Sequence, residues 1–183
     1  FMNPRGNLYV PDAEDIIDNI RKLFNYAKEH KIQILSSIDA HTVDDPEFKL
    51  FPSHCIKGDL GNQKIKESTC DDNIVIENRE QKITESIVDH DQVIVESQTF
   101  DIFESINTEK IVNALDACNY VVFGVATDYC VKAAVLGLLK RGYNVSLVTD
   151  ATKAITKEGE KKSLNEMEGA GAVFTTTENI IEE

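Results

Sequence analysis

The apolar residues of this chain follow two kinds of spacing, and together these predict an α/β fold. Between residues 12 and 31 they recur every three or four positions, which is typical of a helix with one buried face. Residues 32–38 form a short apolar run rich in isoleucine, which is consistent with a buried strand, and residues 119–126 form a continuous apolar run, which is typical of a strand buried on both faces. Further helices are predicted over 107–116, 129–140 and 157–169, and further strands over 73–77, 92–96, 144–149 and 172–176. Because strands and helices alternate, the pattern favours a mostly parallel sheet with helices on both faces.

Local residue types fix some expected ends of these elements. Asp12 is expected to cap the first helix, and Gly142 is placed to end the helix over 129–140. In parallel α/β sheets, ligands bind at the carboxyl ends of the strands. That rule directs attention to Asp39, Glu96 and the segment 126–130.

Length, charge and cysteine content exclude several classes of protein. The 183 residues predict a single domain over 1–183. The formal net charge is −13, which disfavours nucleic acid and anionic membrane surfaces as partners. No apolar run is long enough to span a bilayer, no secretory signal is visible, and no two cysteines are spaced as a CxxC pair. We therefore expect reduced thiols and a cytoplasmic location. The chain opens at Phe1 rather than at a methionine, which suggests processing or a start part-way into a longer reading frame.

Cys130 is the strongest single candidate for chemistry. It follows the predicted strand over 119–126 and opens the next predicted helix. At a helix N-terminus the dipole and the free backbone N–H groups favour a thiolate, and the same N–H groups can bind an oxyanion. The alternative is a buried structural thiol, and position alone does not separate the two. For Cys55, Cys70 and Cys118 the structural interpretation is favoured.

Asp39 and His41 form a second candidate site. They are spaced i, i+2 directly after a predicted strand, so in an extended chain their side chains point to the same side. His54 follows in a loop bounded by prolines, and one aspartate with two histidines suits zinc, manganese or iron. The alternative is an aspartate that caps a turn beside two surface histidines. Glycine-rich phosphate loops are absent from the sequence, so nucleotide-dependent chemistry is not supported.

Several segments together resemble the isochorismatase-like cysteine hydrolases, especially their nicotinamidase branch. The nucleophile segment of that family is similar to residues 124–151, GVATDYCVKAAVLGLLKRGYNVSLVTDA. Its metal loop is similar to DAH at 39–41 and FPSHCIKGDLG at 51–61. QTFDIF at 98–103 resembles the loop after the family's catalytic lysine, and FMNPRGNL at 1–8 resembles the segment after its catalytic aspartate. The likeness spans nearly the whole chain.

The resemblance implies a fold and a set of residue roles. The fold is a Rossmann-like three-layer α/β/α sandwich with a mostly parallel sheet. The family mechanism uses an Asp–Lys–Cys triad and two backbone N–H groups that stabilise the tetrahedral oxyanion. Carried over, the nucleophile is Cys130 and the oxyanion donors are Ala126 and Cys130, with a cis peptide before Ala126. The implied metal ligands are Asp39, His41 and His54. Phe1 and Phe51 are candidate walls of the substrate pocket by analogy, and Tyr129 by its place next to Cys130.

Two departures from the family pattern bear on activity. The triad aspartate and the first strand are expected ahead of Phe1, so we expect the first strand to be missing from this chain. The triad lysine is expected at the position of Ser97, where a hydroxyl replaces the positive charge and Glu96 stands beside it. Loss of a cation next to a thiolate raises the thiol pKa and weakens transition-state stabilisation.

The sequence therefore predicts a nicotinamidase-like hydrolase that cleaves a small carboxamide through a thioester and releases ammonia. The expected cofactor is a divalent metal, zinc first, with manganese and iron as alternatives. We expect a small-molecule substrate and a homo-oligomer, with no nucleic-acid or membrane partner. Two alternatives stay open. One is a catalytically impaired or silent binding or assembly protein on the same fold. The other is a family hydrolase of another small substrate, such as an isochorismate-like ether or a carbamoyl compound.

Overall fold

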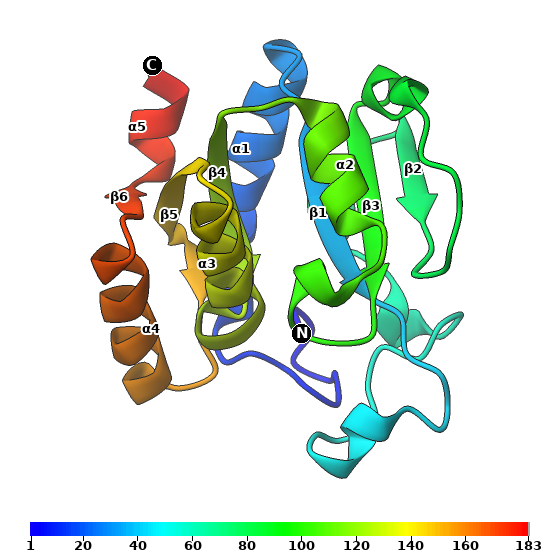
Figure 1. The fold of residues 1–183 in the computed structure, drawn as a ribbon. Coiled ribbons are helices and arrows are strands. Elements are labelled where there is room, and N and C mark those ends of the chain that lie inside the picture. Colours follow the sequence, from blue (N-terminus) through cyan, green and yellow to red (C-terminus); the bar gives the residue numbers. More distant parts are fainter. Residues whose placement is uncertain (183) are drawn as a thin grey trace.

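The computed structural model describes residues 1–182, which form strands and helices in alternation (Figure 1). The strands are Ile34–Asp39 (β1), Asn73–Ile76 (β2), Gln92–Ser97 (β3), Asn119–Val125 (β4), Asn144–Lys153 (β5) and Val173–Thr175 (β6). The helices are Ile17–Glu29 (α1), Thr108–Leu115 (α2), Lys132–Lys140 (α3), Lys157–Gly169 (α4) and Thr177–Glu182 (α5). The predicted α/β class is confirmed, and α5 is an addition that the sequence pattern did not indicate.

All strand pairs are parallel, as predicted, but the described residues form two sheets instead of one. One sheet has the order β1-β3-β2 and the other the order β4-β5-β6. In the first sheet Asp39 lies opposite Ser97, and Ile38 lies opposite Glu96. Within residues 1–182, β1 pairs only with β3 and β4 pairs only with β5. The terminal strands β1 and β4 both lie toward the middle of the molecule (Figure 1).

An apolar cluster beneath α1 joins the two sheets. Ile20 and Phe24 of α1 pack together with Ile34 of β1 and Phe123 of β4. Helix α1 also contacts α5, whereas α3 contacts α4. In Figure 1, α2 and α3 lie in front of the strands and α1 lies behind them, so helices cover both faces. The hydrophobic contact under α1 therefore connects sheets that share no hydrogen bonds among the described residues.

Burial is uneven across the strands. Val95 of β3 and Leu147 of β5 are fully buried, and both of these strands have neighbours on either side. The prediction that 119–126 is buried on both faces is wrong, because Val121 of β4 is 44% exposed. Strand β4 is the terminal strand of its sheet, and most of its residues are only partly buried.

Two of the predicted element ends can be checked directly. Asp12 makes no side-chain cap, so that prediction is wrong; its φ is 58° and a 3₁₀ turn precedes α1. Gly142 ends α3 as predicted, with a φ of 85° and an N–H that donates to the Leu139 carbonyl at 2.9 Å. A left-handed conformation suits glycine at this position because it has no Cβ.

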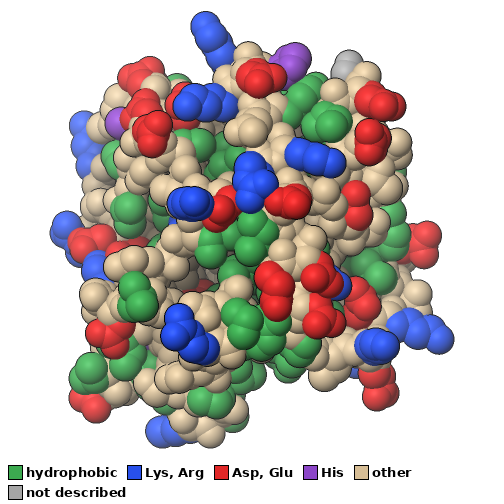
Figure 2. Space-filling model, turned by 180° about the vertical axis from the view of Figure 1, so that it is seen from behind, with side chains coloured by type: hydrophobic (Ala, Val, Ile, Leu, Met, Phe, Trp, Pro, Cys, Tyr) green, Lys and Arg blue, Asp and Glu red, His purple; other side chains and the backbone are tan. Residues whose placement is uncertain are grey.

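The surface mixes charge types despite the net negative charge. Figure 2 shows acidic and basic side chains interspersed with apolar ones on the face behind the view of Figure 1. None of the described helices is both long enough and apolar enough to cross a membrane.

Candidate active site

The candidate residues gather where parallel strands end. Asp39 is the last residue of β1, Ser97 is the last residue of β3, and Val125 is the last residue of β4. A π-helical turn, Thr127–Val131, follows β4 and carries Cys130. Because parallel strands bring their carboxyl ends to one edge, segments far apart in sequence meet there, at the lower edge in Figure 1.

The three predicted metal ligands converge on one point. Nε2 of His41 lies 3.8 Å from Oδ2 of Asp39, and Nε2 of His54 lies 3.7 Å from the same oxygen. The candidate ligand atoms of these residues all lie within 4.8 Å of one another. The backbone N–H of His41 donates to the Cys55 carbonyl at 3.1 Å. This hydrogen bond brings residues 54–57, here called the His54 segment, alongside the end of β1.

The other ring nitrogen of each histidine faces an oxygen. Nδ1 of His54 lies 2.7 Å from the carbonyl oxygen of Pro52, so an Nδ1–H would donate there and leave Nε2 free as a ligand. Nδ1 of His41 lies 3.0 Å from Oδ2 of Asp45. Histidines that bind metals usually have such a partner on the second nitrogen, which fixes the ring orientation.

Two acidic residues of this site were missed by the sequence analysis. Asp45 opens a short 3₁₀ turn and accepts a hydrogen bond from the Glu47 N–H at 2.9 Å. That turn directs Glu47 back toward the site, where its Oε2 lies 3.3 Å from Nε2 of His41. The sequence Asp45-Pro46-Glu47 was the available signal, because aspartate followed by proline is a common helix start.

The electrostatics of this cluster match those of a cation site. Burial disfavours a charged His41, but the carboxylates of Asp39 and Asp45 outweigh burial and raise its pKa to about 9. Burial acts to raise the pKa of Asp39, but contacts with His41 and His54 outweigh it and lower that pKa. Burial raises the pKa of Glu47. Both ring nitrogens of His41 are buried without a hydrogen bond of good geometry, so the cluster has unsatisfied donor atoms at its centre.

Cys130 lies in the turn that the resemblance predicts. The peptide bond between Val125 and Ala126 is cis, as expected for the family. Burial, with a smaller contribution from the Asp39 carboxylate, raises the pKa of the Cys130 thiol to about 12, although the N–H groups of Ala126 and Cys130 act to lower it. Those two N–H groups are the expected oxyanion donors. In this state the thiol is protonated at neutral pH.

The position expected to hold a lysine has no positive charge. The Ser97 side chain is buried, and its hydroxyl donates to the Thr99 carbonyl at 2.8 Å. Beside it, the Glu96 carboxylate accepts a hydrogen bond from Lys57 at 2.9 Å. Among the described residues, the groups with the largest effects on the Cys130 pKa carry either a negative charge or none. No cation is among these groups, so none of the largest contributions from residues 1–182 favours the thiolate through a positive charge.

A small cavity lies between the metal cluster and Cys130. Its volume is about 30 Å³, which is room for about one water molecule. Its lining consists of Phe1, Leu8, Asp39, Glu47, Phe51, His54, Phe100, Ala126, Tyr129, Cys130 and Ile155. All three aromatic residues singled out from the sequence line it, whereas His41 and Ser97 do not. Phe100 was missed, and its ring centroid lies 6.0 Å from that of Tyr129.

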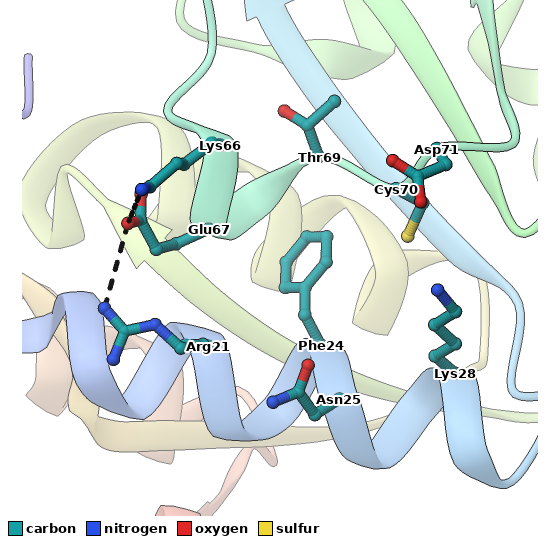
Figure 3. Close-up of a pocket in the computed structure, with 9 residues that line it drawn as sticks. All are labelled: Arg21, Phe24, Asn25, Lys28, Lys66, Glu67, Thr69, Cys70 and Asp71. Atoms are coloured by element: carbon teal, nitrogen blue, oxygen red, sulfur yellow. Dashed lines mark ion pairs between the residues drawn. The ribbon is translucent and has the colours of Figure 1, made fainter.

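A larger cavity lies elsewhere and contains none of these residues. It measures about 460 Å³ and opens between α1 and residues 66–71 (Figure 3). Arg21 and Glu67 form an ion pair across it at 3.7 Å. Its other lining residues include Lys28 and Cys70. Burial raises the pKa of the Cys70 thiol. Size alone therefore does not identify the candidate active site.

Known proteins resemble this chain over nearly its whole length. The isochorismatase domain profile matches residues 1–179. The chain is 24% identical to the nicotinamidase of Saccharomyces cerevisiae over 197 residues, which covers 87% of this chain and 86% of that protein. It is 23% identical to a protein of Arabidopsis thaliana named a probable inactive nicotinamidase, covering 100% of this chain and 90% of that one. The solved pyrazinamidase of Pyrococcus horikoshii in complex with zinc is 26% identical, with a TM-score of 0.78, covering 96% of this chain and 92% of that chain.

These findings define the class of protein. It is an α/β protein of parallel sheets and helices with the isochorismatase-like hydrolase fold. The chain belongs to the isochorismatase family, and its relatives at low identity include nicotinamidases and a pyrazinamidase.

Proposed function

We propose that this chain is a metal-binding cysteine hydrolase that cleaves a small, nicotinamide-like carboxamide and releases ammonia. The observation that carries the proposal is that Cys130, Asp39 and His54 line one cavity, although they come from three separate parts of the chain. A nucleophile and a metal cluster around the same space suit a reaction on one compact substrate. Because the cavity has room for about one water molecule, the side chains that line it would have to separate to admit that substrate. The cytoplasmic location and homo-oligomeric state expected from the sequence belong to this proposal.

The residues present fit a divalent metal. His41 has two buried ring nitrogens without good hydrogen bonds, and its Nε2 and that of His54 both face Asp39 Oδ2. Asp39, His41 and His54 would hold the ion, and Glu47 offers a further oxygen. Two nitrogens with carboxylate oxygens suit zinc first, with manganese or iron as alternatives. When bound, the metal would supply a Lewis acid beside the cavity for a substrate ring nitrogen and for water.

The chain's own residues define the acyl-transfer part of the reaction. The Cys130 sulfur would add to the amide carbonyl carbon, and the N–H groups of Ala126 and Cys130 would donate to the oxyanion. Collapse of the adduct would break the C–N bond, form the thioester and release ammonia, and water would then hydrolyse the thioester. The resemblance implies that an aspartate ahead of Phe1 accepts the thiol proton, and the same group would pass that proton to the leaving nitrogen so that it departs as ammonia. The rings of Phe1, Phe51 and Tyr129 would face an aromatic substrate.

A specific observation favours a second candidate, a catalytically silent binding protein on the same fold. The Cys130 pKa is about 12, and no cation occupies the Ser97 position. The relative from Arabidopsis thaliana that is named a probable inactive nicotinamidase is consistent with this second candidate. A protein of this kind would bind metal and a small ligand without turnover.

The test is ammonia release from nicotinamide by the zinc-loaded chain. It would be measured for the chain of 183 residues and for a form extended at its N-terminus by the strand and aspartate of a relative. Release that disappears in Cys130→Ala but persists in Cys118→Ala supports the hydrolase. Zinc binding without release by either form supports the silent protein. Turnover retained in purified Cys130→Ala would contradict the proposed nucleophile.

A further inference from the structure

We propose that Lys57 is a positioning residue for the metal site, because its side chain forms ion pairs that hold the His54 segment against the sheet. This inference rests on the metal site of the proposed function. Lys57 was not a candidate in the sequence, and it has no contact with the ligand atoms themselves. Its role would be exerted through the backbone that places His54 opposite Asp39.

The His54 segment has few backbone bonds to the sheet. The N–H of His41 donates to the Cys55 carbonyl at 3.1 Å, and the N–H of Lys57 donates to the His41 carbonyl at 2.9 Å. These form an isolated parallel bridge rather than a strand. Cys55 also has a φ of 45°, a left-handed conformation that is unfavourable for a residue with a Cβ. Such a segment needs tertiary contacts to keep its shape.

The Lys57 side chain provides two of these contacts, and the Asn7 side chain adds another by donating to the Ser53 carbonyl at 2.8 Å. Nζ of Lys57 lies 2.7 Å from Oε1 of Glu77, just after β2, and 2.9 Å from the carboxylate oxygens of Glu96 in β3. Glu77 is partly exposed, but Glu96 is only 8% exposed. Glu96 precedes Ser97, which lies opposite Asp39 in the sheet register. The Lys57 ammonium therefore links the His54 segment by ion pairs to the ends of β2 and β3, which belong to the same sheet as Asp39.

Loss of Lys57 has two separable effects. It removes the ion pairs that hold the His54 segment against the sheet. It also leaves the Glu96 carboxylate buried without a partner, which by itself destabilises a protein. When Glu96→Gln is added to a Lys57 variant, it removes the buried negative charge but does not restore the link between the His54 segment and the sheet. Comparison of the single and double variants thus separates positioning of His54 from general stability.

The experiment measures the zinc dissociation constant by competition with a chelator, with folding checked by circular dichroism. We expect Lys57→Met to weaken zinc binding about tenfold or more, as changes outside the ligand shell commonly do. Lys57→Arg should recover most of the affinity. The matched control is Lys66→Met, because Lys66 is a nearby lysine with an 89% exposed side chain. It should leave zinc affinity unchanged.

The decisive variant is Lys57→Met with Glu96→Gln. If it is folded and still binds zinc about tenfold more weakly than Glu96→Gln alone, the positioning role is supported, even if Lys57→Met alone fails to fold. If its zinc affinity is within twofold of that of Glu96→Gln, the positioning role is overturned while the metal site stands. If the unchanged chain binds no zinc, the metal site and the role of Lys57 are both overturned.

Discussion

Oδ2 of Asp45 lies 3.0 Å from Nδ1 of His41, four residues earlier in the chain. Nε2, on the other side of the buried imidazole, faces Asp39 and Glu47. Asp45 is itself held by its position at the start of the 3₁₀ turn Pro46–Lys49. The candidate metal site therefore includes a carboxylate beside the second ring nitrogen of a candidate ligand, which is where metal-binding histidines usually have a partner.

The first prediction concerns metal stoichiometry. After chelation and reloading with zinc, elemental analysis should give about one metal per chain, and His41→Ala should abolish binding because it removes the central ligand. His30→Ala is the matched control, since His30 lies at the exposed end of α1 and stacks on Tyr26. Equal zinc content in His41→Ala and the unchanged chain would rule out the site.

The second prediction is a pH dependence that follows from His41. Its pKa in the metal-free fold is about 9, above the usual 6.5, so protonation stabilises the fold fully below pH 6.5. This stability is lost as pH rises through 9, and the shift corresponds to at most about 3 kcal/mol. Zinc must displace that proton, so zinc affinity should rise roughly tenfold per pH unit toward pH 9 and then level off. Competition with a chelator at several pH values measures it, and a flat profile would contradict it.

The third prediction concerns thiol reactivity. With a pKa of about 12, Cys130 in the metal-free chain should be alkylated by iodoacetamide far more slowly at neutral pH than the exposed Cys118. Its rate should rise through pH 10 without a plateau. Zinc should accelerate the reaction, because a cation offsets the Asp39 charge that raises the pKa. Mass spectrometry of each cysteine peptide gives both rates in one sample. A plateau below pH 8 would instead indicate an activated thiol.

The fourth prediction concerns Ser97. In the N-terminally extended form, Ser97→Lys should increase ammonia release, because an ammonium near the Cys130 thiolate would stabilise it by on the order of 1–4 kcal/mol. That corresponds to roughly one to three powers of ten in rate. Ser97→Met is the control, since it adds a long side chain without charge. Full activity of the unchanged Ser97 form would mean that another residue supplies the charge. Equal inactivity of both forms with bound zinc would favour the silent protein.

The fifth prediction tests how the nucleophile turn is anchored. Asp128 accepts a hydrogen bond from the Ile155 N–H at 3.0 Å, just before α4. A Cβ on Gly159 would lie 2.5 Å from Oδ2 of Asp128, so Gly159→Ala should destabilise the fold by about 1–3 kcal/mol. Gly169→Ala, in the same helix with nothing within 4 Å, should be neutral or stabilise it by up to about 1 kcal/mol. Urea unfolding of both variants gives the comparison, and equal midpoints would contradict the prediction.

The features that the sequence predicted correctly depend on neighbouring residues. The spacing of apolar residues indicated the alternation of strands and helices, and Gly142 marked the end of α3 because only local backbone geometry matters there. The i, i+2 spacing of Asp39 and His41 after a strand was likewise enough to place both at a strand end. The position of Cys130 after β4 followed in the same way.

What the sequence could not determine depends on contacts between distant segments. The exposure of Val121 depends on how many neighbours β4 has in its sheet. The approach of Glu47 to His41 depends on the direction of a short turn. Likewise, the pairing of Lys57 with Glu96 joins residues 39 positions apart. These contacts form only when the fold brings the strand ends together. Hydrophobic periodicity specifies which face of a helix or strand is buried, but it does not specify which polar side chains meet at the strand ends.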